Sequence, residues 1–430
     1  MNHVVTFPCF SRMALLSGAI ATTAVSFWLA SSSYAAPTDL QDSPKAVLDE
    51  AWQIVNREYV DPSFNQVDWQ RTRQELLSRN YSSRQEAYEA LNKALERLGD
   101  PYTRFMNPSQ YQALTSQTAG EMSGVGLRLE VDETHQVLQV AEPIENSPAI
   151  RAGLQAGDRI LAIDGQSTRG MTAEAAAKLI RGEVGTQVTL LIEREAGKSF
   201  PVALTRARIE LPTVRYTLRE EGGQRIGYIR LSEFNAHAAD QMRRAIRNLE
   251  NQNVQAFVLD LRGNPGGLLH ASIEIARMWM KEGAIVQTVD RENHDEKIMA
   301  NRTALTDLPL AILVDGNSAS ASEILTGALK DNRRATVIGT QTFGKALVQS
   351  VHGLSDGSGV AVTIAHYYTP NGTDISKKGI TPDIAITLTE DQRRQLSSEP
   401  QLLGTPRDPQ YSQAVRLLSA RGVTVPVAIK

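Results

Sequence analysis

The chain has 430 residues, of which 41% are hydrophobic and 22% are charged, and its formal net charge is −3. This size and composition predict a globular protein of two or three domains. Lys and Arg do not outnumber Asp and Glu, which argues against a nucleic-acid partner. The seven histidines are scattered without the pair spacing of a metal site, so we expect neither a metal nor a cofactor.

Residues 1–35 have the pattern of a signal peptide for export. Arg12 precedes an apolar stretch at residues 13–30, and Ser33 and Ala35 supply the small residues that a signal peptidase reads, so we expect cleavage after Ala35. A retained membrane anchor is the alternative, because the apolar stretch approaches the length of a membrane span. The only cysteine, Cys9, lies in this segment, so the mature chain would have neither disulfides nor a thiol nucleophile.

Residues 40–118 are predicted to form an N-terminal helical region. Apolar residues recur there at helical spacing in two stripes. The stripes are Val47, Ala51, Ile54 and Val55, followed by Leu91, Leu95 and Leu98. Gly99 and Pro101 end the helix that carries the second stripe.

Residues 121–207 change to short strands separated by turns and resemble a PDZ domain. The expected peptide-binding loop consists of Ser123, Gly124, Val125, Gly126 and Leu127. Its glycines would let successive backbone N–H groups converge on a terminal carboxylate, while the exposed sheet edge accepts the peptide as an added strand. A nucleotide-binding loop is excluded because no long phosphate-binding helix follows. A helix over residues 172–180 would form the other wall of the groove.

Residues 208–390 have the alternating strand and helix pattern of an α/β domain. Strands are predicted over residues 225–231 and 255–261, with a helix over residues 238–249 between them. The second strand enters the loop at residues 262–267, which resembles the nucleophile loop of trypsin-like proteases but has Pro265 where their serine would be. This loop therefore cannot attack a substrate. Its glycines indicate either close backbone approach to a ligand or a tight turn.

Residues 311–350 contain the candidate active site. An apolar strand at residues 311–314, a turn at 315–317 and a helix at 321–330 deliver a cluster of small residues to a helix start. Within this cluster, Ser320 and Glu323 have the spacing of a capping box, which is a common helix-start signature without catalytic meaning.

Lys345 gives the serine a second interpretation, because it follows the next predicted strand among apolar and small residues. A serine hydroxyl is a weak nucleophile, and a lysine can act as its base only if burial leaves the amine neutral. Lowering the lysine pKa from about 10.4 by roughly three units would cost about 4 kcal/mol. Gln349 lies four residues further on the same face, where its amide would hold the amine in place.

This stretch resembles the carboxyl-terminal processing proteases, also called tail-specific proteases, which use a Ser/Lys pair. The shared elements are Asn-x-Ala-Ser-Ala-Ser-Glu at residues 317–323, Phe-Gly-Lys at residues 343–345, and a glutamine four residues on. The resemblance implies that Ser320 is the nucleophile, Lys345 the base and Gln349 its partner. It further implies an oxyanion hole made by an N–H of Gly266 or Gly267 together with the N–H of Ala321.

The resemblance covers nearly all of the mature chain and implies a multidomain α+β architecture. Its parts are an N-terminal helical region, a PDZ domain and an α/β crotonase/ClpP-like Ser/Lys protease domain. Residues 94–111 resemble the family's N-terminal region, which packs beside the PDZ domain, and we interpret them as a packing and dimerisation element. Residues 391–430 are predicted to be a tail with one amphipathic stretch at 410–418 and no readable function.

The implied function is that of a secreted serine endopeptidase that recognises substrate C-termini through its PDZ domain and removes C-terminal extensions or degrades tailed proteins. Its partners would be proteins or peptides with free C-termini, while membrane-protein substrates and a homo-oligomer stay open. The sequence is most similar to the cyanobacterial and chloroplast branch, in which one member matures a photosystem II reaction-centre subunit. The expected location is therefore the periplasm or the thylakoid lumen.

Two alternatives belong to other classes. A catalytically silent PDZ-containing binding protein could share this fold, since a fold does not establish a function. The intact Ser320, Lys345 and Gln349 argue against it. A chymotrypsin-like PDZ protease would need a His and an Asp before a Gly-x-Ser-Gly loop, and the sequence has no such loop.

Overall fold

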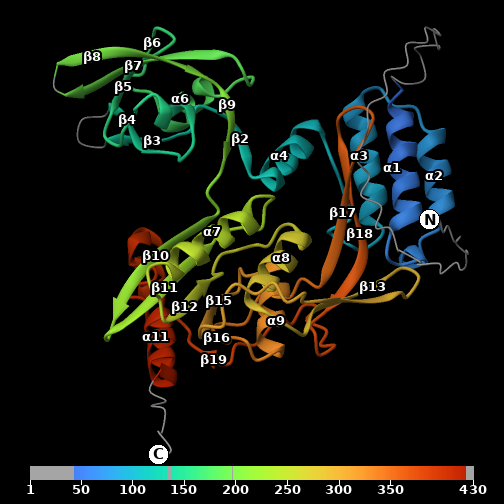
Figure 1. The fold of residues 1–430 in the computed structure, drawn as a ribbon. Helices are drawn as coiled ribbons and strands as arrows, with labels where there is room; N and C mark the ends of the chain where they lie inside the picture. Colours follow the sequence, from blue (N-terminus) through green and yellow to red (C-terminus); the bar gives the residue numbers. More distant parts are fainter. Residues whose placement is uncertain (1–42, 133–136, 196, 423–430) are drawn as a thin grey trace, which may run out of the picture. The chain divides into compact units, whose positions relative to one another are not determined.

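The computed structural model describes residues 43–132, 137–195 and 197–422. The predicted signal peptide and its alternative, a membrane anchor, lie outside the described residues. Within the described part of the chain, no helix is both long and apolar enough to cross a membrane. Figure 1 shows the elements in chain order, from the blue helices to the red C-terminal helix.

The N-terminal region is helical, as the two apolar stripes predicted. Its elements are α1 (Pro44–Glu58), η1 (Phe64–Gln66), α2 (Trp69–Ser78), α3 (Arg84–Glu96), a short strand β1 (Arg104–Met106) and α4 (Pro108–Ala119). Both stripes are buried in one core. Side chains of Asp68, Ser83 and Asn107 cap α2, α3 and α4 by accepting an N–H of the first turn, which explains where these helices begin.

This region shares its core with the two strands β17 (Leu347–Gly353) and β18 (Gly359–Tyr368). The contributing residues outside the N-terminal region are Leu354, Val360 and Val362. Strand β1 also pairs antiparallel with β18, with Arg104 opposite Ala361. Residues 94–111 thus dock on a β-hairpin of the protease domain through β1, and α4, which begins within this segment, contacts β2 of the PDZ region. β1 was not predicted, because three residues are too few to show a period.

The PDZ region is an antiparallel sheet with two short helices. Its elements are β2 (Glu121–Gly124), β3 (Leu127–Asp132), β4 (Val137–Pro143), α5 (Pro148–Arg151), β5 (Arg159–Ile163), β6 (Gln166–Ser167), α6 (Ala173–Ile180), β7 (Gln187–Glu195), β8 (Lys198–Thr205) and β9 (Ala207–Glu210). The main sheet has the order β3-β4-β5-β7-β8, so β3 is an edge strand, while β2 and β9 pair as a separate ribbon. Thr172 caps α6, which matches the helix predicted at residues 172–180.

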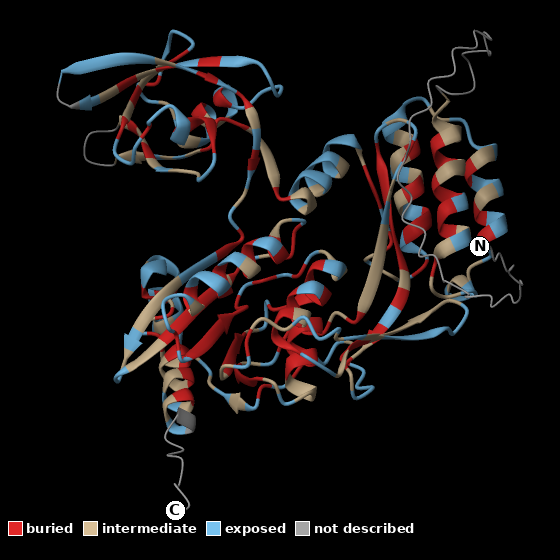
Figure 2. Ribbon diagram, viewed as in Figure 1, coloured by how far each residue is buried: buried red, intermediate tan, exposed pale blue. Residues whose placement is uncertain are grey.

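The protease domain is built on a six-stranded sheet with the order β10-β11-β12-β15-β16-β19. These strands are β10 (Val214–Glu221), β11 (Gln224–Leu231), β12 (Ala256–Asp260), β15 (Leu310–Val314), β16 (Thr336–Gly339) and β19 (Ile384–Ala385). The strands from β11 to β19 are parallel, and β10 is antiparallel to β11. Figure 2 shows the central strands almost entirely as buried backbone, which fits their continuous apolar sequences.

Helices cover both faces of this sheet. Leu310, Ile312 and Val314 share one core with α7 (Ala238–Glu250), α8 (Leu269–Trp279) and α9 (Ala321–Asp331). Ala311 and Leu313 point to the opposite core, as alternation along a strand requires. A second sheet joins β17 and β18 to β1 and to the hairpin of β13 (Ala284–Asp290) and β14 (Asp295–Met299).

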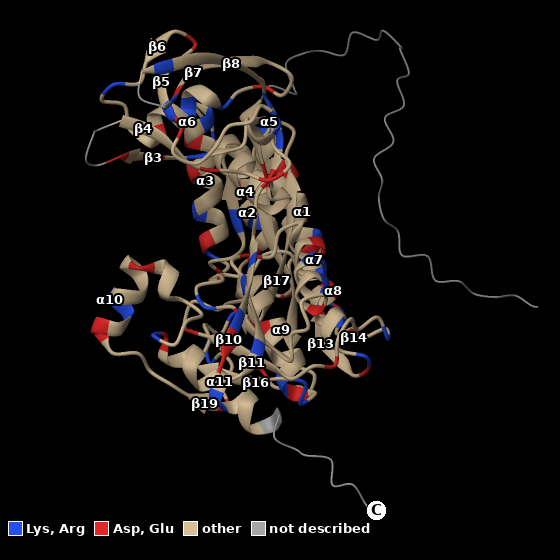
Figure 3. Cartoon of the chain, turned by 60° about the vertical axis from the view of Figure 1, so that its left-hand side comes forward, with Lys and Arg blue, Asp and Glu red and all other residues tan. Residues whose placement is uncertain are grey.

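The residues after 390, predicted as a tail, contribute to the protease core. They form α10 (Glu390–Ser398), η2 (Pro400–Leu402) and α11 (Pro409–Gly422). Tyr411, Ala414 and Leu418 of α11 cover the second face of the parallel sheet, so the predicted amphipathic stretch has a structural role. Acidic and basic residues share the surface of α10, which Figure 3 shows in red and blue.

A buried charge network ties this C-terminal segment to the loop after β12. The Arg262 guanidinium donates to Asp260 (2.6 Å) and to Asp408 (2.7 Å), and all three side chains are at most 7% exposed. Gln410 also accepts from Arg262 (2.9 Å). Because each charge has a partner, the network is satisfied, and it fixes the base of the glycine-rich loop.

Candidate active site

Ser320 lies at a sharp turn between β15 and α9, directly before the first helical residue. Its backbone angles are φ 54° and ψ −113°, a conformation that side-chain-bearing residues rarely adopt. Such a residue costs roughly 1–3 kcal/mol and persists only where its surroundings hold it, which is common at catalytic sites. A strained serine between a strand and a helix also has the geometry that exposes a nucleophile.

The neighbouring serines hold this turn in place. Ser318 and Ser322 are fully buried. The Ser318 hydroxyl donates to the Leu261 carbonyl (2.9 Å), and the Ser322 hydroxyl donates to the Asn264 carbonyl (2.9 Å). These two hydroxyls therefore anchor the turn that carries Ser320 to the end of β12 and to the glycine-rich loop that follows it.

Glu323 has a larger role than the capping residue that the sequence predicted. Its buried carboxylate does accept the Ser320 N–H (2.9 Å), as expected for a cap. It also accepts from three groups near the lysine, which are the N–H of Lys345 (2.9 Å), the N–H of Gly344 (2.7 Å) and the Thr342 hydroxyl (2.6 Å). Glu323 thus joins the backbone of Ser320 to that of Lys345.

Tyr367 makes a second connection between the same two residues. Its buried hydroxyl donates to the backbone carbonyl of Lys345 and lies 3.2 Å from the carbonyl of Ser320. Burial raises the pKa of Tyr367 well above its ordinary value, so the phenol stays protonated and remains a donor. No sequence pattern marks Tyr367 as a site residue, because its partners are backbone atoms of residues distant in the sequence.

The environment of Lys345 favours a neutral amine. Burial lowers the pKa of Lys345, and the positive charge of Arg104 lowers it further, whereas Asp100 and Glu323 act in the opposite direction. The amine nitrogen lies 4.6 Å from the centroid of the Tyr102 ring. This is the direction of shift that a lysine base requires.

Gln349 projects toward the same cavity from β17. Leu347, Val348, Gln349 and Val351 of this strand line the cavity, and Lys345, two residues before the strand, lines it too. A β-bulge separates Val348 from Gln349. The Gln349 amide also lies 3.5 Å from the Thr363 hydroxyl, at the long end of the hydrogen-bond range.

The glycine-rich loop approaches Ser320 so closely that it excludes side chains. A Cβ on Gly266 would lie 2.9 Å from the Ser320 Cβ, and one on Gly267 would lie 2.2 Å from the Phe234 carbonyl oxygen. Both glycines have positive φ. The Gly266 N–H already donates to the Asn264 side chain (2.9 Å). Of the two glycine N–H groups predicted for the oxyanion hole, that of Gly267 is therefore the available donor. Ala321 is the first residue of α9, where backbone N–H groups have no helical partner.

The predicted residues meet at a cavity of about 580 Å³. Its lining includes Ser320, Ala321, Lys345, Gln349 and Gly267. Most of the other lining residues are apolar, namely Leu114, Pro265, Leu268, Leu269, Ile324, Leu347, Val348, Val351 and Ala361. Within the described residues, no group of three or more His, Cys, Asp or Glu side chains is placed to hold a metal ion.

The predicted PDZ loop is only partly a loop in the structure. Ser123 and Gly124 end β2 and pair with β9, Val125 and Gly126 connect β2 to β3, and Leu127 begins the edge strand β3. Gly126 has a φ of 80°, and a Cβ there would lie 2.1 Å from the Ser147 Cβ, so this position requires glycine. Gly124 has open space around it. Leu127 begins β3, whose free edge lies at the side of the sheet where a peptide strand could be added.

Fold and site together define a protease with a PDZ domain, and comparisons with known proteins agree. Residues 225–386 match the model of peptidase family S41, and residues 139–194 match that of the PDZ domain. The chain is 44% identical to a carboxyl-terminal-processing protease of Picosynechococcus sp. over 386 residues, which is 89% of this chain and 90% of the relative. It is 42% identical to carboxyl-terminal-processing peptidase 2, chloroplastic, of Arabidopsis thaliana, over 78% of this chain and 67% of the relative.

The solved structure of a photosystem II D1 C-terminal processing protease resembles this one with a TM-score of 0.54 and 36% identity. The match covers 86% of this chain and 99% of the other. The chain therefore belongs to peptidase family S41 and is a C-terminal processing protease, a serine peptidase. The resemblance found in the sequence and the predicted fold are confirmed.

Proposed function

We propose that Ser320 is the nucleophile of this protease and that Lys345 is its general base. The observation that carries this proposal is the single cavity lined by Ser320, Lys345 and Gln349 together with Gly267 and Ala321. The backbone strain at Ser320 and the lowered pKa of Lys345 support it.

In this mechanism, the neutral Lys345 amine takes the hydroxyl proton of Ser320 as the serine oxygen attacks the substrate carbonyl carbon. The N–H groups of Gly267 and Ala321 stabilise the negative charge on the carbonyl oxygen. The lysine ammonium then gives its proton to the leaving amine, and the C-terminal fragment departs. A water molecule then gives a proton to the neutral lysine and attacks the acyl carbon, and the lysine ammonium returns that proton to the departing Ser320 oxygen, which restores the hydroxyl and the neutral amine. Gln349 orients the amine throughout.

Hydrolysis of a peptide with a free C-terminal tail tests this assignment. Ser320→Ala should abolish cleavage, while Ser318→Ala and Ser322→Ala should lose stability but keep the chemistry, since their hydroxyls bond to backbone carbonyls. Activity that survives in Ser320→Ala would rule out this nucleophile. If no tailed peptide is cut by the folded wild-type protein, the alternative of a silent binding protein on the same fold would replace it.

The PDZ domain would recognise the substrate's terminal carboxylate. The proposed contacts are the loop Ser123, Gly124, Val125, Gly126 and Leu127 and the free edge of β3. The proposed PDZ domain spans residues 121–207, and the ribbon of β2 with β9, which continues to Glu210, joins its sheet to the rest of the chain. Limited proteolysis should release a stable fragment with ends near these residues, and cuts confined to the sheet interior would contradict the boundaries.

The substrate proposed here is the C-terminal extension of a membrane protein such as the D1 subunit, because the similar structure is a D1 processing protease. The corresponding location is the thylakoid lumen or the periplasm, reached through the signal peptide at residues 1–35. Two measurements test these points. Mass spectrometry should show unprocessed D1 C-termini in cells that lack this chain, and N-terminal sequencing should show that the mature protein begins at Ala36. A normal D1 C-terminus, or a mature protein that retains residues 1–35, would contradict them.

A further inference from the structure

The short segment at residues 100–104, from the N-terminal region, is held firmly against the protease domain. The Asp100 carboxylate accepts the Tyr102 N–H (2.9 Å) and the Thr103 hydroxyl (2.7 Å), which closes a tight turn. The buried Thr103 hydroxyl accepts the Thr363 N–H of β18 (3.0 Å). Arg104 follows as the first residue of β1, opposite Ala361. This turn therefore has a fixed position relative to β18.

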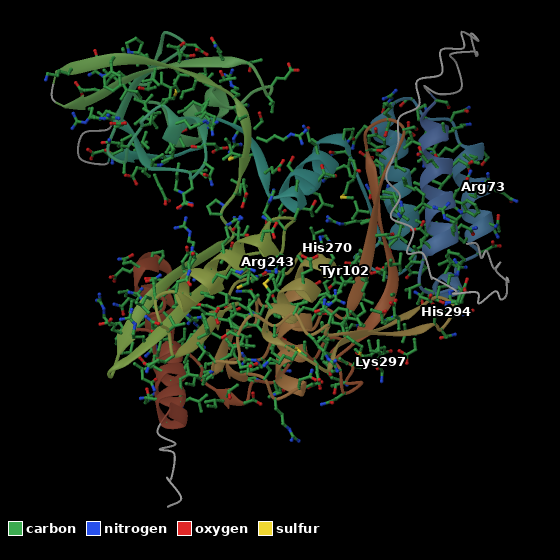
Figure 4. The ribbon with its side chains drawn as sticks, viewed as in Figure 1. Arg73, Tyr102, Arg243, His270, His294 and Lys297 are labelled. Carbon is green, nitrogen blue, oxygen red and sulfur yellow. The ribbon has the colours of Figure 1, made fainter. Side chains whose placement is uncertain are left out.

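Three side chains of this segment face the catalytic cavity. Pro101, Tyr102 and Arg104 line the cavity that also contains Ser320 and Lys345. Leu269, the first residue of α8, lines the same cavity as Tyr102. Figure 4 labels Tyr102 next to His270 of that helix. The Tyr102 ring centroid lies 4.6 Å from the Lys345 nitrogen, within the distance of a cation–π contact.

The charged groups that act on Lys345 come from two parts of the chain. Asp100 and Arg104 belong to this segment, and Glu323 belongs to α9. Asp100 accepts hydrogen bonds within the turn, and Glu323 accepts from Ser320 and residues 342–345, but both stay negatively charged and favour the ammonium form of Lys345. Arg104, an exposed residue that lines the same cavity as Lys345, carries the positive charge that opposes protonation of the amine.

We infer that the N-terminal region completes the active site: Arg104 keeps the Lys345 amine neutral before attack, and the Tyr102 ring stabilises the ammonium formed when the amine takes the serine proton. The inference rests on the proposed Ser/Lys mechanism. One wall of the cavity, formed by Pro101, Tyr102 and Arg104, then comes from outside both the PDZ match at residues 139–194 and the S41 match at residues 225–386. Tyr102 and Arg104 are thus tuning and positioning residues, since they act through Lys345.

The pH dependence of kcat/KM on a tailed peptide tests the role of Arg104. Activity depends on the neutral amine, so it rises with pH through the pKa of Lys345. Arg104→Gln removes a repulsive charge and should move this rise to higher pH by about half a unit to one unit. Arg104→Lys keeps the charge and should leave the rise in place. An unmoved profile in Arg104→Gln, with KM raised instead, would overturn this role and make Arg104 a substrate contact.

The plateau of kcat at high pH tests the role of Tyr102. Tyr102→Leu should lower this plateau roughly 2- to 30-fold, the range for loss of a cation–π contact. Tyr102→Phe keeps the ring face and should restore it. Equal losses in both variants, or no loss in Tyr102→Leu, would overturn the assignment.

A readout independent of turnover separates this inference from the mechanism on which it rests. In a Ser320→Ala background, the rate at which cyanate carbamoylates the Lys345 amine reports its neutral fraction at each pH by mass spectrometry. Arg104→Gln should shift that titration upward. If Lys345→Arg is inactive but Arg104→Gln leaves the titration unmoved, the Ser/Lys mechanism stands and this inference fails. If Lys345→Arg retains turnover, the proposed mechanism fails first.

Discussion

Glu323→Gln is predicted to displace the proposed nucleophile, Ser320, from its proposed base, Lys345, with almost no change in side-chain volume. In the native protein, one carboxylate oxygen accepts from the Gly344 N–H and the Thr342 hydroxyl, and the other accepts from the N–H groups of Ser320 and Lys345. An amide replaces one of these oxygens by an NH₂ group, which is a donor. Whichever way the amide turns, two donors lose their acceptor.

Each unsatisfied buried donor costs about 1–3 kcal/mol, so the expected loss in the free energy of unfolding is roughly 2–6 kcal/mol. The backbone of Ser320 or of the segment carrying Lys345 would shift to relieve this loss. Misplacement of a catalytic group by about 1 Å can reduce the rate about 100-fold. We therefore expect kcat/KM to fall at least about 100-fold with KM little changed.

The assay compares urea unfolding and peptide cleavage for the wild type, Glu323→Gln and Glu296→Gln. The last is a matched control, because Glu296 is an exposed residue of β14. It should leave both quantities unchanged. A Glu323→Gln protein with wild-type stability and wild-type kcat/KM would refute the claim that this carboxylate holds the active site together.

Three further predictions follow from the cavity, the PDZ loop and the buried charge network. Activity should rise with pH through the lowered pKa of Lys345 and then stay constant, and Lys345→Arg should be inactive because a guanidinium stays protonated; turnover by that variant would exclude a lysine base. Amidating the substrate's C-terminus, or introducing Gly124→Asp where there is open space, should lower cleavage of tailed peptides by roughly five- to 150-fold and leave cleavage of short untailed peptides unchanged. Equal rates for the amide and the free acid would show that the PDZ domain does not recognise the terminal carboxylate. Burial would raise the pKa of Asp260, but Arg262 holds it below its ordinary value, so stability should be lost as pH falls below about 4. Calorimetry of Asp260→Gln should show a less stable protein whose stability falls less steeply at acid pH, and an unchanged acid dependence would contradict this.

The sequence was a good guide wherever a feature repeats locally. Apolar patterns and caps predicted the stripes of the N-terminal helices, the α6 and α9 helices and the strands β11, β12, β15 and β16. They did not predict β10 or the two-residue strand β19. The Ser-x-x-Glu spacing also predicted the hydrogen bond that the Ser320 N–H donates to the Glu323 carboxylate. These features depend on residues only a few positions apart.

Contacts between distant residues could not be predicted in this way. Arg262 pairs with Asp408, 146 positions away in the sequence. Tyr102 contacts Lys345, although the PDZ region and part of the protease domain separate the two residues in the sequence. Glu323 was hidden for a different reason, because a local cap is a sufficient explanation of its spacing and conceals the three other bonds it accepts. Likewise, the use of the Gly266 N–H by Asn264 depends on a side-chain orientation that no spacing reveals.

Trapping the covalent intermediate is the most direct test of Ser320 as the nucleophile. The enzyme would be mixed with a tailed peptide, quenched in acid within milliseconds, digested and analysed by mass spectrometry. We expect an acyl adduct, with the mass of the substrate's N-terminal fragment, on the hydroxyl of Ser320, and no such adduct in Lys345→Arg. An adduct on another residue, or cleavage of the peptide by a Ser320→Ala protein, would contradict the assignment of this serine as the nucleophile.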